Sequence, residues 1–288
     1  MSMKTTLKGT TAGQGLRRLA TMRCFPFLKH DDIISNQWTG PDLTIAVIAD
    51  LHVVSPWVTL RHVRDIADAV NDLGADVIML AGDFLAGRNL PGKSASMAEI
   101  VDALATLNAP FGVFAVLGNH DWYDCDLATR TQHAENSVVN ALRDSKFHFL
   151  QNENLVINHP DGRFWVAGMD SQRPNPRDRT TGYHNPDLAF AGIPDAANAI
   201  LLAHEPDYFA QGDRRPALQI SGHTHGGQLN LFGWRPMTPS IYRGRYAYGH
   251  HVDGDRQMIV SAGVGFSGLP LRIGQVPEVN LIRLRSAE

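Results

Sequence analysis

The chain has 288 residues, of which 26 are Lys or Arg and 29 are Asp or Glu, so its formal net charge is −3. A hydrophobic fraction of 43% with 19% charged residues is typical of a soluble globular protein. No long basic block occurs in the main body of the chain, which argues against a general nucleic-acid-binding surface. The only cysteines, Cys24 and Cys125, are too few for a disulfide framework.

The start of the chain differs from the rest in its charge. Its first 30 residues carry six Lys or Arg and no acid. None of its apolar runs approaches the roughly 18–20 residues of a membrane span. Arg23 also interrupts the apolar stretch that an export signal after Arg17-Arg18 would need. We therefore predict a basic tail over residues 1–42, one domain over residues 43–288, and a cytoplasmic location.

Two structures of the tail stay open. Three apolar residues recur beside the arginines at three-residue spacing: Leu16, Leu19 and Met22. A short basic amphipathic helix of this kind binds an anionic membrane surface, which would place the protein peripherally at the inner membrane. A solvated, partly disordered tail is the alternative.

From residue 43 onward, short apolar runs alternate with helical patterns. In chain order we predict a strand at Thr44–Ala49, a helix at Val58–Leu73, a strand at Asp76–Ala81, a helix at Ser94–Leu107, a strand at Phe111–Leu117, a helix at Ser137–Asp144, and strands at Phe164–Ala167, Ala199–Ala203, Leu218–Ser221, Met258–Ser261 and Val279–Leu284. Strand–helix alternation indicates an α/β domain. The strand-rich second half indicates a mixed sheet or two stacked sheets. The proline-containing segment Asp170–Pro186 is predicted to be one long surface loop.

Residue types that bind metals follow several of these strands directly. They are Asp50 and His52 after the first strand, Asp83 after the second, Asn119, His120 and Asp121 after the third, and His204, His223 and His225 after later strands. Ligands of α/β sheets gather outside the carboxyl ends of the strands, so these side chains can converge although they are far apart in sequence. Carboxylate oxygens and imidazole nitrogens suit Mn, Fe or Zn. The sequence therefore predicts a metal site.

The order of the motifs DLH, GDF, GNHD, AHEPD and GHTHGGQ resembles the calcineurin-like metallophosphoesterase superfamily over roughly residues 43–285. The segment Ser261–Gly274 (SAGVGFSGLPLRIG) is similar to its bacterial YkuE-like phosphodiesterase branch. Glu205 stands where that branch usually has Asn, which puts the edge of the pocket in doubt but leaves His204 in place. The resemblance implies a four-layer α/β/β/α sandwich of two mixed sheets.

The resemblance also implies two divalent metal ions, with manganese favoured over iron or zinc. One ion would be bound by Asp50, His52 and His225, and the other by Asn119, His204 and His223. Asp83 would bridge them with its two carboxylate oxygens. Two such ions lower the pKa of a bridging water, and the resulting hydroxide attacks phosphorus in line with the leaving oxygen.

The catalytic candidates beside the metals are His120 and Asp121. By resemblance, His120 does not bind metal and instead stabilises the transition state or protonates the leaving oxygen. Asp121 follows it and could orient its ring through a hydrogen bond. An acid that only caps the turn is the alternative for Asp121.

Two further segments allow a functional and a structural interpretation. Three arginines of the long loop, Arg173, Arg177 and Arg179, either hold a second phosphate or are solvated. The segment Leu231–Tyr248 interleaves aromatic residues with arginines. It forms either a pocket or membrane-surface lid near the site, or part of the core.

We therefore expect a metal-dependent hydrolase of phosphodiesters or pyrophosphates, with a lipid-linked phosphoester as a further hypothesis and a small phosphoester as the simpler substrate. The preference for diesters rests on the branch resemblance. A phosphomonoesterase is the closest alternative, and a non-catalytic scaffold of the same fold is a more distant one. No nucleic-acid partner is expected from the charge.

Overall fold

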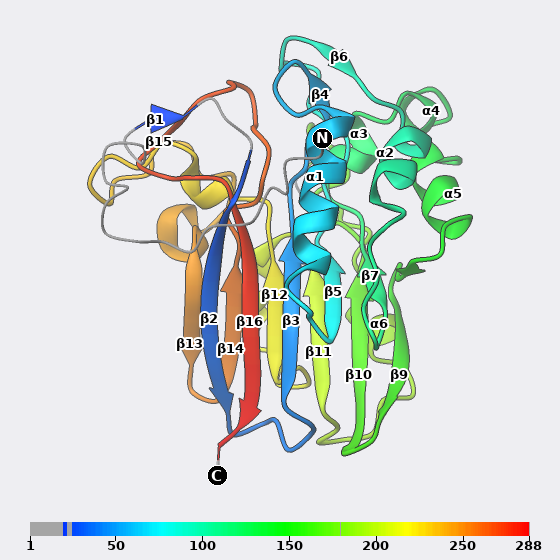
Figure 1. Ribbon diagram of the computed structural model, residues 1–288, viewed down its shortest axis with the longest axis vertical. Helices are drawn as coiled ribbons and strands as arrows, with labels where there is room; N and C mark the ends of the chain where they lie inside the picture. Colours follow the sequence, from blue (N-terminus) through cyan, green and yellow to red (C-terminus); the bar gives the residue numbers. More distant parts are fainter. Residues whose placement is uncertain (1–19, 22–24, 179, 288) are drawn as a thin grey trace.

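Two six-stranded sheets lie face to face in the structure, a computed structural model that describes residues 20–21, 25–178 and 180–287 (Figure 1). In spatial order, the first sheet contains β2 (Phe27–Ser35), β16 (Glu278–Ser286), β3 (Leu43–Ile48), β5 (Val77–Leu80), β7 (Val113–Ala115) and β8 (His148–Phe149). The second contains β13 (Gly249–Asp253), β14 (Arg256–Val260), β12 (Leu218–Ser221), β11 (Ala199–Ala203), β10 (Gly162–Met169) and β9 (Glu153–His159). Two short pairs join β1 (Ala20–Thr21) with β15 (Arg272–Ile273) and β4 (Val54–Ser55) with β6 (Lys93–Ser94).

Both sheets are mixed. In the first, β3, β5, β7 and β8 run parallel and β16 is antiparallel to β3. In the second, β10, β11, β12 and β14 run parallel, and β9 and β13 are antiparallel strands at the edges. Each of the predicted strands overlaps an observed one, so the predicted α/β class is confirmed.

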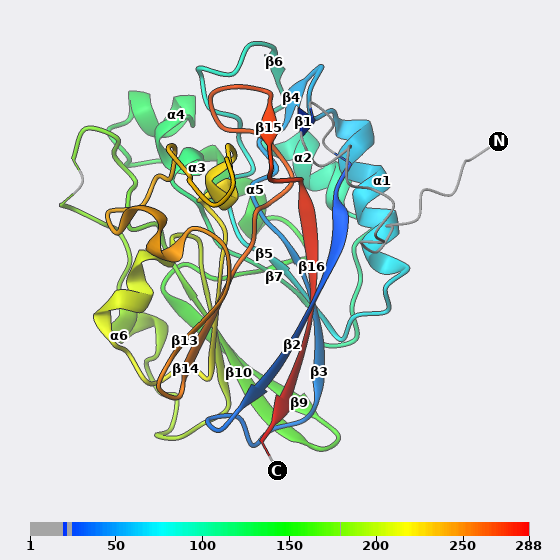
Figure 2. The ribbon, with the colours of Figure 1, turned by 90° about the vertical axis from the view of Figure 1, so that its left-hand side faces the viewer.

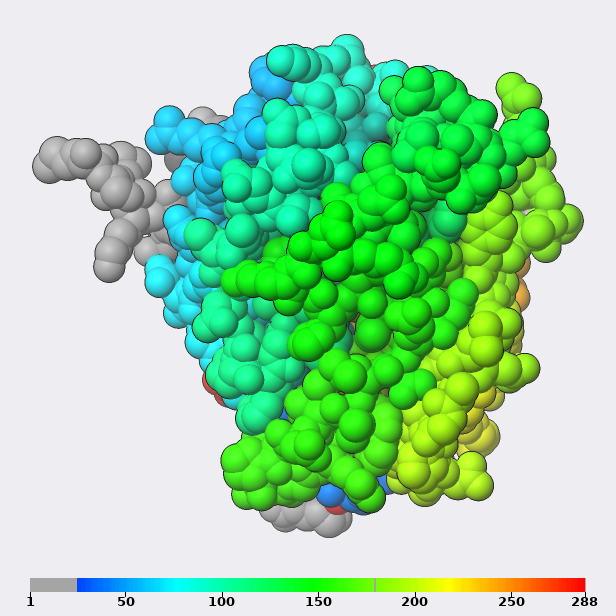
Figure 3. All heavy atoms as spheres, turned by 90° about the vertical axis from the view of Figure 1, so that its right-hand side faces the viewer, coloured from blue at the N-terminus to red at the C-terminus, as the bar shows by residue number. Residues whose placement is uncertain are grey.

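Helices cover the outer face of each sheet, which makes four layers (Figure 2). On the first sheet they are α1 (Leu60–Asn71), α2 (Met97–Leu104) and α5 (Ser137–Arg143). On the second they are the short α6 (Pro186–Ala189) and the 3₁₀ helices η2 (Pro206–Gln211) and η4 (Arg243–Tyr246). Seen from the side of α5 and β9, these layers form one continuous surface (Figure 3). The four-layer sandwich is confirmed.

Strand β3 shows how one strand serves two cores. Successive side chains of a strand point to opposite faces of its sheet. Ile45 and Val47 are buried between the two sheets, whereas Ala46 and Ile48 pack under the helical layer. The strand is therefore apolar along its whole length, which is why its sequence shows no alternation of polar and apolar residues.

The helices of the first layer begin at capping boxes. The Thr59 side chain accepts the backbone N–H of His62 at the start of α1, and Ser96 does the same for Glu99 at the start of α2. Each partner side chain bonds back to the backbone of the cap, which satisfies two amide groups that a helix start leaves unpaired. The helices predicted at 58–73 and 94–107 are therefore longer than the observed ones, which begin directly after these caps.

The boundary predicted at residue 43 is wrong, because β2 belongs to the sandwich. It pairs in parallel with β16 along its whole length, from Phe27 opposite Glu278 to Ser35 opposite Ser286. The polar run in the middle of β2 hides the strand in the sequence. Within this run Asp31 forms an ion pair of 3.0 Å with Lys29, and its carboxylate accepts the side-chain amide of Asn280 on β16 at 2.9 Å.

The rest of the predicted tail is only partly described. Antiparallel pairing joins β1 to β15. The three residues of the predicted amphipathic helix, Leu16, Leu19 and Met22, lie outside the described residues. Within the part of the chain that the structure describes, no helix has both the length and the apolar character to cross a bilayer.

Substitution of Ile33 in β2 will test whether this strand is part of the folded domain. Ile33 is buried and the neighbouring Ile34 is exposed. Ile33→Ala removes packed methyl groups and is expected to lower the free energy of unfolding by about 2–5 kcal/mol. Ile34→Ala, the matched control, is expected to change it by less than about 0.5 kcal/mol. Equal effects of the two substitutions in urea unfolding would contradict the assignment.

Candidate metal centre

Seven predicted ligand residues converge at one end of the sandwich. They follow the carboxyl ends of β3, β5 and β7 in the first sheet and of β11 and β12 in the second: Asp50, His52, Asp83, Asn119, His204, His223 and His225. All seven are buried. The parallel strands of the two sheets end on the same side, so residues 175 positions apart in sequence share one site.

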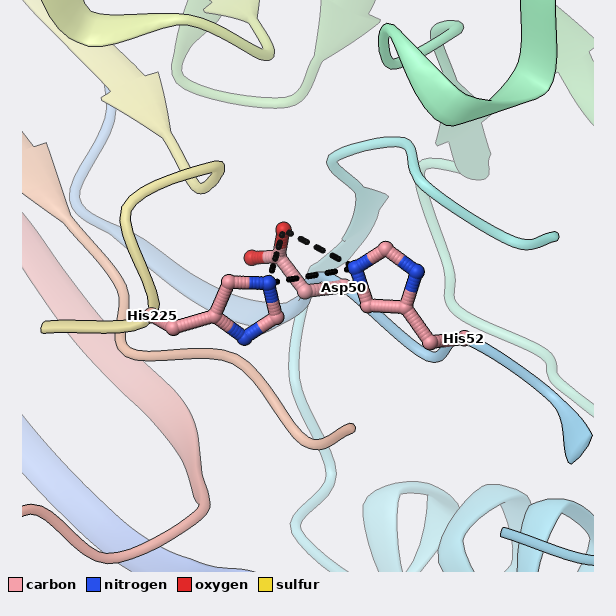
Figure 4. Close-up of side chains that lie close together, drawn as sticks. All are labelled: Asp50, His52 and His225. Atoms are coloured by element: carbon pink, nitrogen blue, oxygen red, sulfur yellow. Dashed lines mark hydrogen bonds and ion pairs between the residues drawn. The ribbon is translucent and has the colours of Figure 1, made fainter. Parts of the chain in front are cut away.

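The first group contains Asp50, His52 and His225, whose ligand atoms point toward one another (Figure 4). Asp50 Oδ1 lies 3.6 Å from His225 Nε2 and 4.0 Å from His52 Nε2. The two ring nitrogens are 3.1 Å apart. His225 opens the short 3₁₀ helix η3 (His225–Gly227). One carboxylate oxygen and two imidazole nitrogens therefore surround a single point.

The second group contains Asp83, His204 and His223. Asp83 Oδ2 lies 3.1 Å from His204 Nε2 and 3.6 Å from His52 Nε2, so this oxygen faces both groups. Asp83 Oδ1 instead accepts the backbone N–H of His120 at 2.8 Å. The prediction that Asp83 uses its two oxygens, one for each ion, therefore does not fit, because only Oδ2 is directed into the site.

The backbone around these groups is strained. Five of the seven predicted ligand residues have positive φ angles: Asp50, His52, Asp83, His223 and His225. Such conformations cost roughly 1–3 kcal/mol each in non-glycine residues and persist where the surrounding structure enforces them. Glycines leave the room that is needed, since a Cβ atom on Gly222 or Gly263 would lie 2.6 Å from Asp50 Oδ2.

Hydrogen bonds to backbone carbonyls orient three of the histidine rings. Nδ1 of His52 bonds to Leu85 O at 2.8 Å, and Nδ1 of His204 bonds to Ala81 O at 2.7 Å. His223 uses Nε2 toward Pro239 O at 2.7 Å. A carbonyl only accepts, so each ring donates there, and in a neutral ring the other nitrogen is then unprotonated.

His225 differs from the other three rings. Its Nδ1 lies 3.1 Å from the guanidinium of the buried Arg272, which has no acceptor atom. This contact therefore does not favour the tautomer in which the other ring nitrogen, Nε2, lacks a proton and is free to bind a metal ion. Arg272 also donates to the backbone oxygens of Gly265 and His225, so it holds the two surrounding segments together.

Burial keeps most of these rings neutral. It lowers the pKa of His52 to about 4 and holds the pKa values of His223 and His225 well below the usual range. Burial, with the charge of Asp83, raises the pKa of Asp50 to about 7. For His204, the adjacent Asp83 outweighs the effect of burial and raises the pKa. Neutral imidazoles are the form that binds metals.

The sequence profile of the family described as calcineurin-like phosphoesterase matches residues 43–227, which is well over half of the chain. The chain belongs to the calcineurin-like phosphoesterase family. It is 30% identical to the uncharacterized metallophosphoesterase YkuE of Bacillus subtilis over 84% of this chain and 79% of that protein. It is 29% identical to the phosphodiesterase YaeI of Escherichia coli over 96% of this chain and 94% of that protein.

Two further relatives differ more in length or in sequence. A zebrafish transmembrane protein with a metallophosphoesterase domain is 27% identical over 85% of this chain, which spans about half (54%) of that protein. A zebrafish dimetal phosphatase of known structure is 14% identical, with a TM-score of 0.43 over 78% of this chain and 88% of its own.

This phosphoesterase is a metal-dependent hydrolase of phosphoric esters, and its family uses a dinuclear divalent metal centre. The residues present fit that group. Oδ1 of Asn119 is buried and has no hydrogen-bond partner among the described residues. Unpaired buried polar atoms are costly in a folded protein unless an ion satisfies them.

The ring of His120 is oriented by Tyr123 and Asp124, which were not among the predicted site residues. His120 opens α3 (His120–Tyr123), and its Nδ1 lies 2.5 Å from Asp124 Oδ2. Its Nε2 lies 2.9 Å from the Tyr123 hydroxyl. The spacing of four residues between His120 and Asp124, one helical turn, was the available indication. Burial opposes a charged ring here, but Asp83 and Asp124 outweigh it and raise the pKa of His120.

The predicted orienting role of Asp121 is wrong. Its two carboxylate oxygens accept the backbone N–H groups of Asp83, Phe84, Leu85 and Gly118 at 2.8–3.0 Å. Asp121 therefore ties the turn after β5 to the turn after β7. It stabilises the backbone that presents Asp83, and Asp124 is the residue that contacts the His120 ring.

A polar cavity of about 500 Å³ adjoins the metal centre. His120, Asn119 and His223 line it together with two arginines, Arg88 and Arg173. Of the other loop arginines, Arg177 is exposed and Arg179 lies outside the described residues. The segment 170–185 forms a loop without helix or strand in its described residues, as predicted.

Glu205, the departure from the branch pattern, holds this loop at the cavity. Its buried carboxylate accepts the Ser171 hydroxyl at 2.5 Å and the backbone N–H of Gln172 at 3.0 Å. The next residue, Arg173, donates to Pro239 O beside His223. Glu205 therefore acts on the pocket edge through the position of Arg173.

A second, more apolar cavity of about 300 Å³ lies on the other side of Pro239 and Ser267, which line both cavities. His225 and Met237 are in its wall. The segment Leu231–Tyr248 was predicted to be either a pocket or membrane-surface lid, or part of the core. Tyr246 is buried against β14 and belongs to the core, whereas Phe232 and Trp234 are exposed.

The contact of Asp124 with His120 predicts a specific change in kinetics. Asp124→Asn removes the negative charge that orients the ring, and we expect turnover to fall by about 10- to 100-fold with metal content unchanged. Loss of that charge also lowers the pKa of His120, so the fall of the rate at high pH shifts to lower pH. Asp126→Asn, an exposed neighbour in α4 (Asp126–Arg130), is the control. Unchanged rates and pH profile in Asp124→Asn would refute the orienting role.

The pKa values predict that metal uptake releases protons. In the metal-free protein, Asp50 carries a proton below a pH of about 7, and the raised pKa of His204 keeps that ring protonated as well. A divalent cation must displace these protons, so its affinity falls as the pH is lowered, by about tenfold per pH unit for each proton. Titration calorimetry with Mn²⁺ at pH 6, 7 and 8, in buffers of different ionisation enthalpy, measures both effects. Affinity that does not vary with pH would be inconsistent with this prediction.

Proposed function

We propose that this protein hydrolyses phosphodiesters or pyrophosphates with two divalent cations held by its seven converging side chains. The observation that carries the proposal is the pair of buried groups that share Asp83 Oδ2. Asp50, His52 and His225 would hold one cation, and Asn119, His204 and His223 the other. Asp83 would serve both through the single oxygen that faces them.

Two bound cations supply the positive charge that acidifies a water molecule and neutralises phosphate oxygens. We propose manganese, with iron and zinc as alternatives, because mixed nitrogen and oxygen ligands accept all three. The chain itself contributes a rigid arrangement. Asp50 Oδ1 and Oδ2 each lie 3.0 Å from the backbone N–H of His223, which fixes the carboxylate before any ion binds.

His120 is the proposed proton donor to the leaving oxygen. Its ring lines the polar cavity, and Asp124 fixes Nδ1, so Nε2 is the atom that can donate. The raised pKa of His120 favours the protonated ring that this role needs. Arg88 and Arg173 in the same cavity match the geometry and charge of phosphate oxygens.

The two cavities support a substrate with a substituent on each side of phosphorus. The polar cavity accepts a charged or sugar-like group, and the apolar cavity accepts a second group. A phosphomonoester, the alternative substrate, would leave one cavity empty. The similarity to a protein named a phosphodiesterase agrees with the diester proposal.

A lipid-linked phosphoester is the finer form of this proposal. The cavity beside His225 is lined by Pro236, Met237 and Pro239, and Met237 is half exposed at its edge. An apolar chain attached to the phosphate would contact these residues while the phosphate occupied the metal centre. A small phosphoester would not use this contact.

Hydrolysis of two chromogenic substrates tests the proposal. With Mn²⁺ supplied, we expect a higher kcat/KM for bis-p-nitrophenyl phosphate than for p-nitrophenyl phosphate. His120→Ala should retain two metal ions per chain and lose about 10²–10⁴-fold in turnover, as expected for a lost general acid. Removal of the metals with a chelator should abolish activity, and added Mn²⁺ should restore it.

Elemental analysis of the His120→Ala protein is the control, since it separates loss of the proton donor from loss of metal. A preference for the monoester would replace the diester proposal with the alternative. Full turnover by a metal-replete His120→Ala protein would remove His120 from the chemistry.

A further inference from the structure

Seven exposed large hydrophobic side chains lie shortly after His225 in the chain or at Leu269, whose backbone oxygen accepts Gln228 Nε2 at 3.0 Å. We call them the apolar rim: Leu231, Phe232, Trp234, Met237, Ile241, Tyr242 and Leu269. They are most of the eleven such side chains in the part of the chain that the structure describes. Met237 belongs both to the rim and to the wall of the cavity that contains His225. A concentration of exposed apolar side chains of this kind marks a site of interaction.

The most exposed part of the rim is a two-residue hairpin. The backbone N–H of Leu231 donates to Trp234 O at 2.9 Å, and that of Trp234 donates to Leu231 O at 3.1 Å. The turn between them consists of Phe232 and Gly233, both with positive φ. Such turns favour Asn-Gly or Gly-Gly, and a bulky aromatic residue at positive φ is an outlier.

This strain has no compensation inside the folded chain. Phe232 is fully exposed (108%) and Trp234 is 65% exposed, so no described residue packs over the tip of the hairpin. A backbone conformation that costs roughly 1–3 kcal/mol is stored at positions where it serves a function. Here it projects an aromatic ring away from the surface, toward something outside the chain.

The hairpin is fixed rigidly to the metal-binding segment. The backbone N–H of Asn230 donates to Ile273 O at 2.7 Å, and Arg235 Nε donates to Gly226 O at 2.9 Å. Gly226 follows His225 directly. Whatever binds the rim is therefore held in a defined position relative to the site.

The charged residues within the rim segment itself are all cationic. Between Asp213 and Asp253 the sequence contains no acidic residue. Arg243 and Arg245 are exposed, and Arg235 is half buried at the base of the hairpin. Aromatic residues that project from a surface flanked by arginines are typical of proteins that lie on anionic membranes.

Strand β1, the first described segment of the chain, lies next to the base of the hairpin. Strand β1 pairs with β15, and Ile273 of β15 bonds to Asn230 at the base of the hairpin (Figure 1). Residues 1–19, which precede β1, contain four cationic residues and no acid: Lys4, Lys8, Arg17 and Arg18.

We propose that the apolar rim docks on an anionic lipid bilayer, with Phe232 and Trp234 inserted among the lipids and the arginines at the headgroups. This orientation turns the cavity beside His225 toward the membrane. The proposed function supplies the reason for such an arrangement, but docking itself does not require hydrolysis. Failure of either proposal can therefore be recognised separately.

Vesicle flotation with full-length protein tests the docking. The probe is vesicles of phosphatidylcholine with phosphatidylglycerol, compared with phosphatidylcholine alone. We expect binding to the anionic vesicles that weakens as salt is added, because exposed charges are screened. Phe232→Ser/Trp234→Ser should lower the partition coefficient by about tenfold or more, since two aromatic rings no longer leave water. Its hydrolysis of bis-p-nitrophenyl phosphate should stay at the unsubstituted rate.

Leu188→Ser is the matched control, because Leu188 is 57% exposed on α6 and lies outside the rim. It should float like the unsubstituted protein. A second measurement reports insertion directly: lipids brominated in their acyl chains should quench tryptophan fluorescence, and Trp234→Phe should remove that quenching while the other four tryptophans remain.

Four results would overturn the proposal. Absence of flotation with anionic vesicles excludes a bilayer as the occupant. Equal flotation of the double variant and the unsubstituted protein assigns membrane binding to another surface. Flotation that begins only after residues 1–19 are deleted, or a dimer in sedimentation that the double variant abolishes, identifies the N-terminal segment or a second copy of the chain as the occupant.

Discussion

Two carboxylates, Asp50 and Asp83, are buried at the point where the strands of both sheets end, and the rest of the site follows from that burial. Anionic groups removed from water must be neutralised or bound by cations. Histidines surround them with most rings held neutral, and the side-chain amide oxygen of Asn119 has no partner among the residues that the structure describes. The arrangement is suited to binding divalent cations, which neutralise the charge of phosphate oxygens.

The same requirement shapes the backbone. Strand ends deliver the side chains at positive φ, glycines leave room for Asp50, and Asp121 collects four backbone N–H groups to hold two of the turns. The strain is concentrated where the sandwich is rigid. Around this centre the surface is divided, because one side presents Arg88 and Arg173 in a polar cavity and the other presents apolar residues. A substrate that is polar at one end and apolar at the other suits both sides.

The exposed hairpin lies on the apolar side of the metal centre. Phe232, which has a positive φ angle, and the arginines near it lie on this apolar side. The polar cavity lies on the side of His120 and Asp124. Orientation of the enzyme on a membrane and selection of its substrate would then be two consequences of one surface. Loop Asp170–Pro186, tied down by Glu205, positions Arg173 opposite that surface.

The sequence by itself determined the strand order along the chain, the α/β class and the seven residues that converge, since apolar runs and the residues that follow them are local features. Only the tertiary structure decided that β2 completes a sheet, because its burial depends on pairing with β16, whose residues lie 251 positions further along the chain (Phe27 opposite Glu278). It also decided that Asp124 rather than Asp121 contacts His120, and that Asp83 faces the site with one oxygen. Adjacency in sequence suggested Asp121, but the direction of a side chain depends on the turn that carries it, and that turn is fixed by contacts between distant strands.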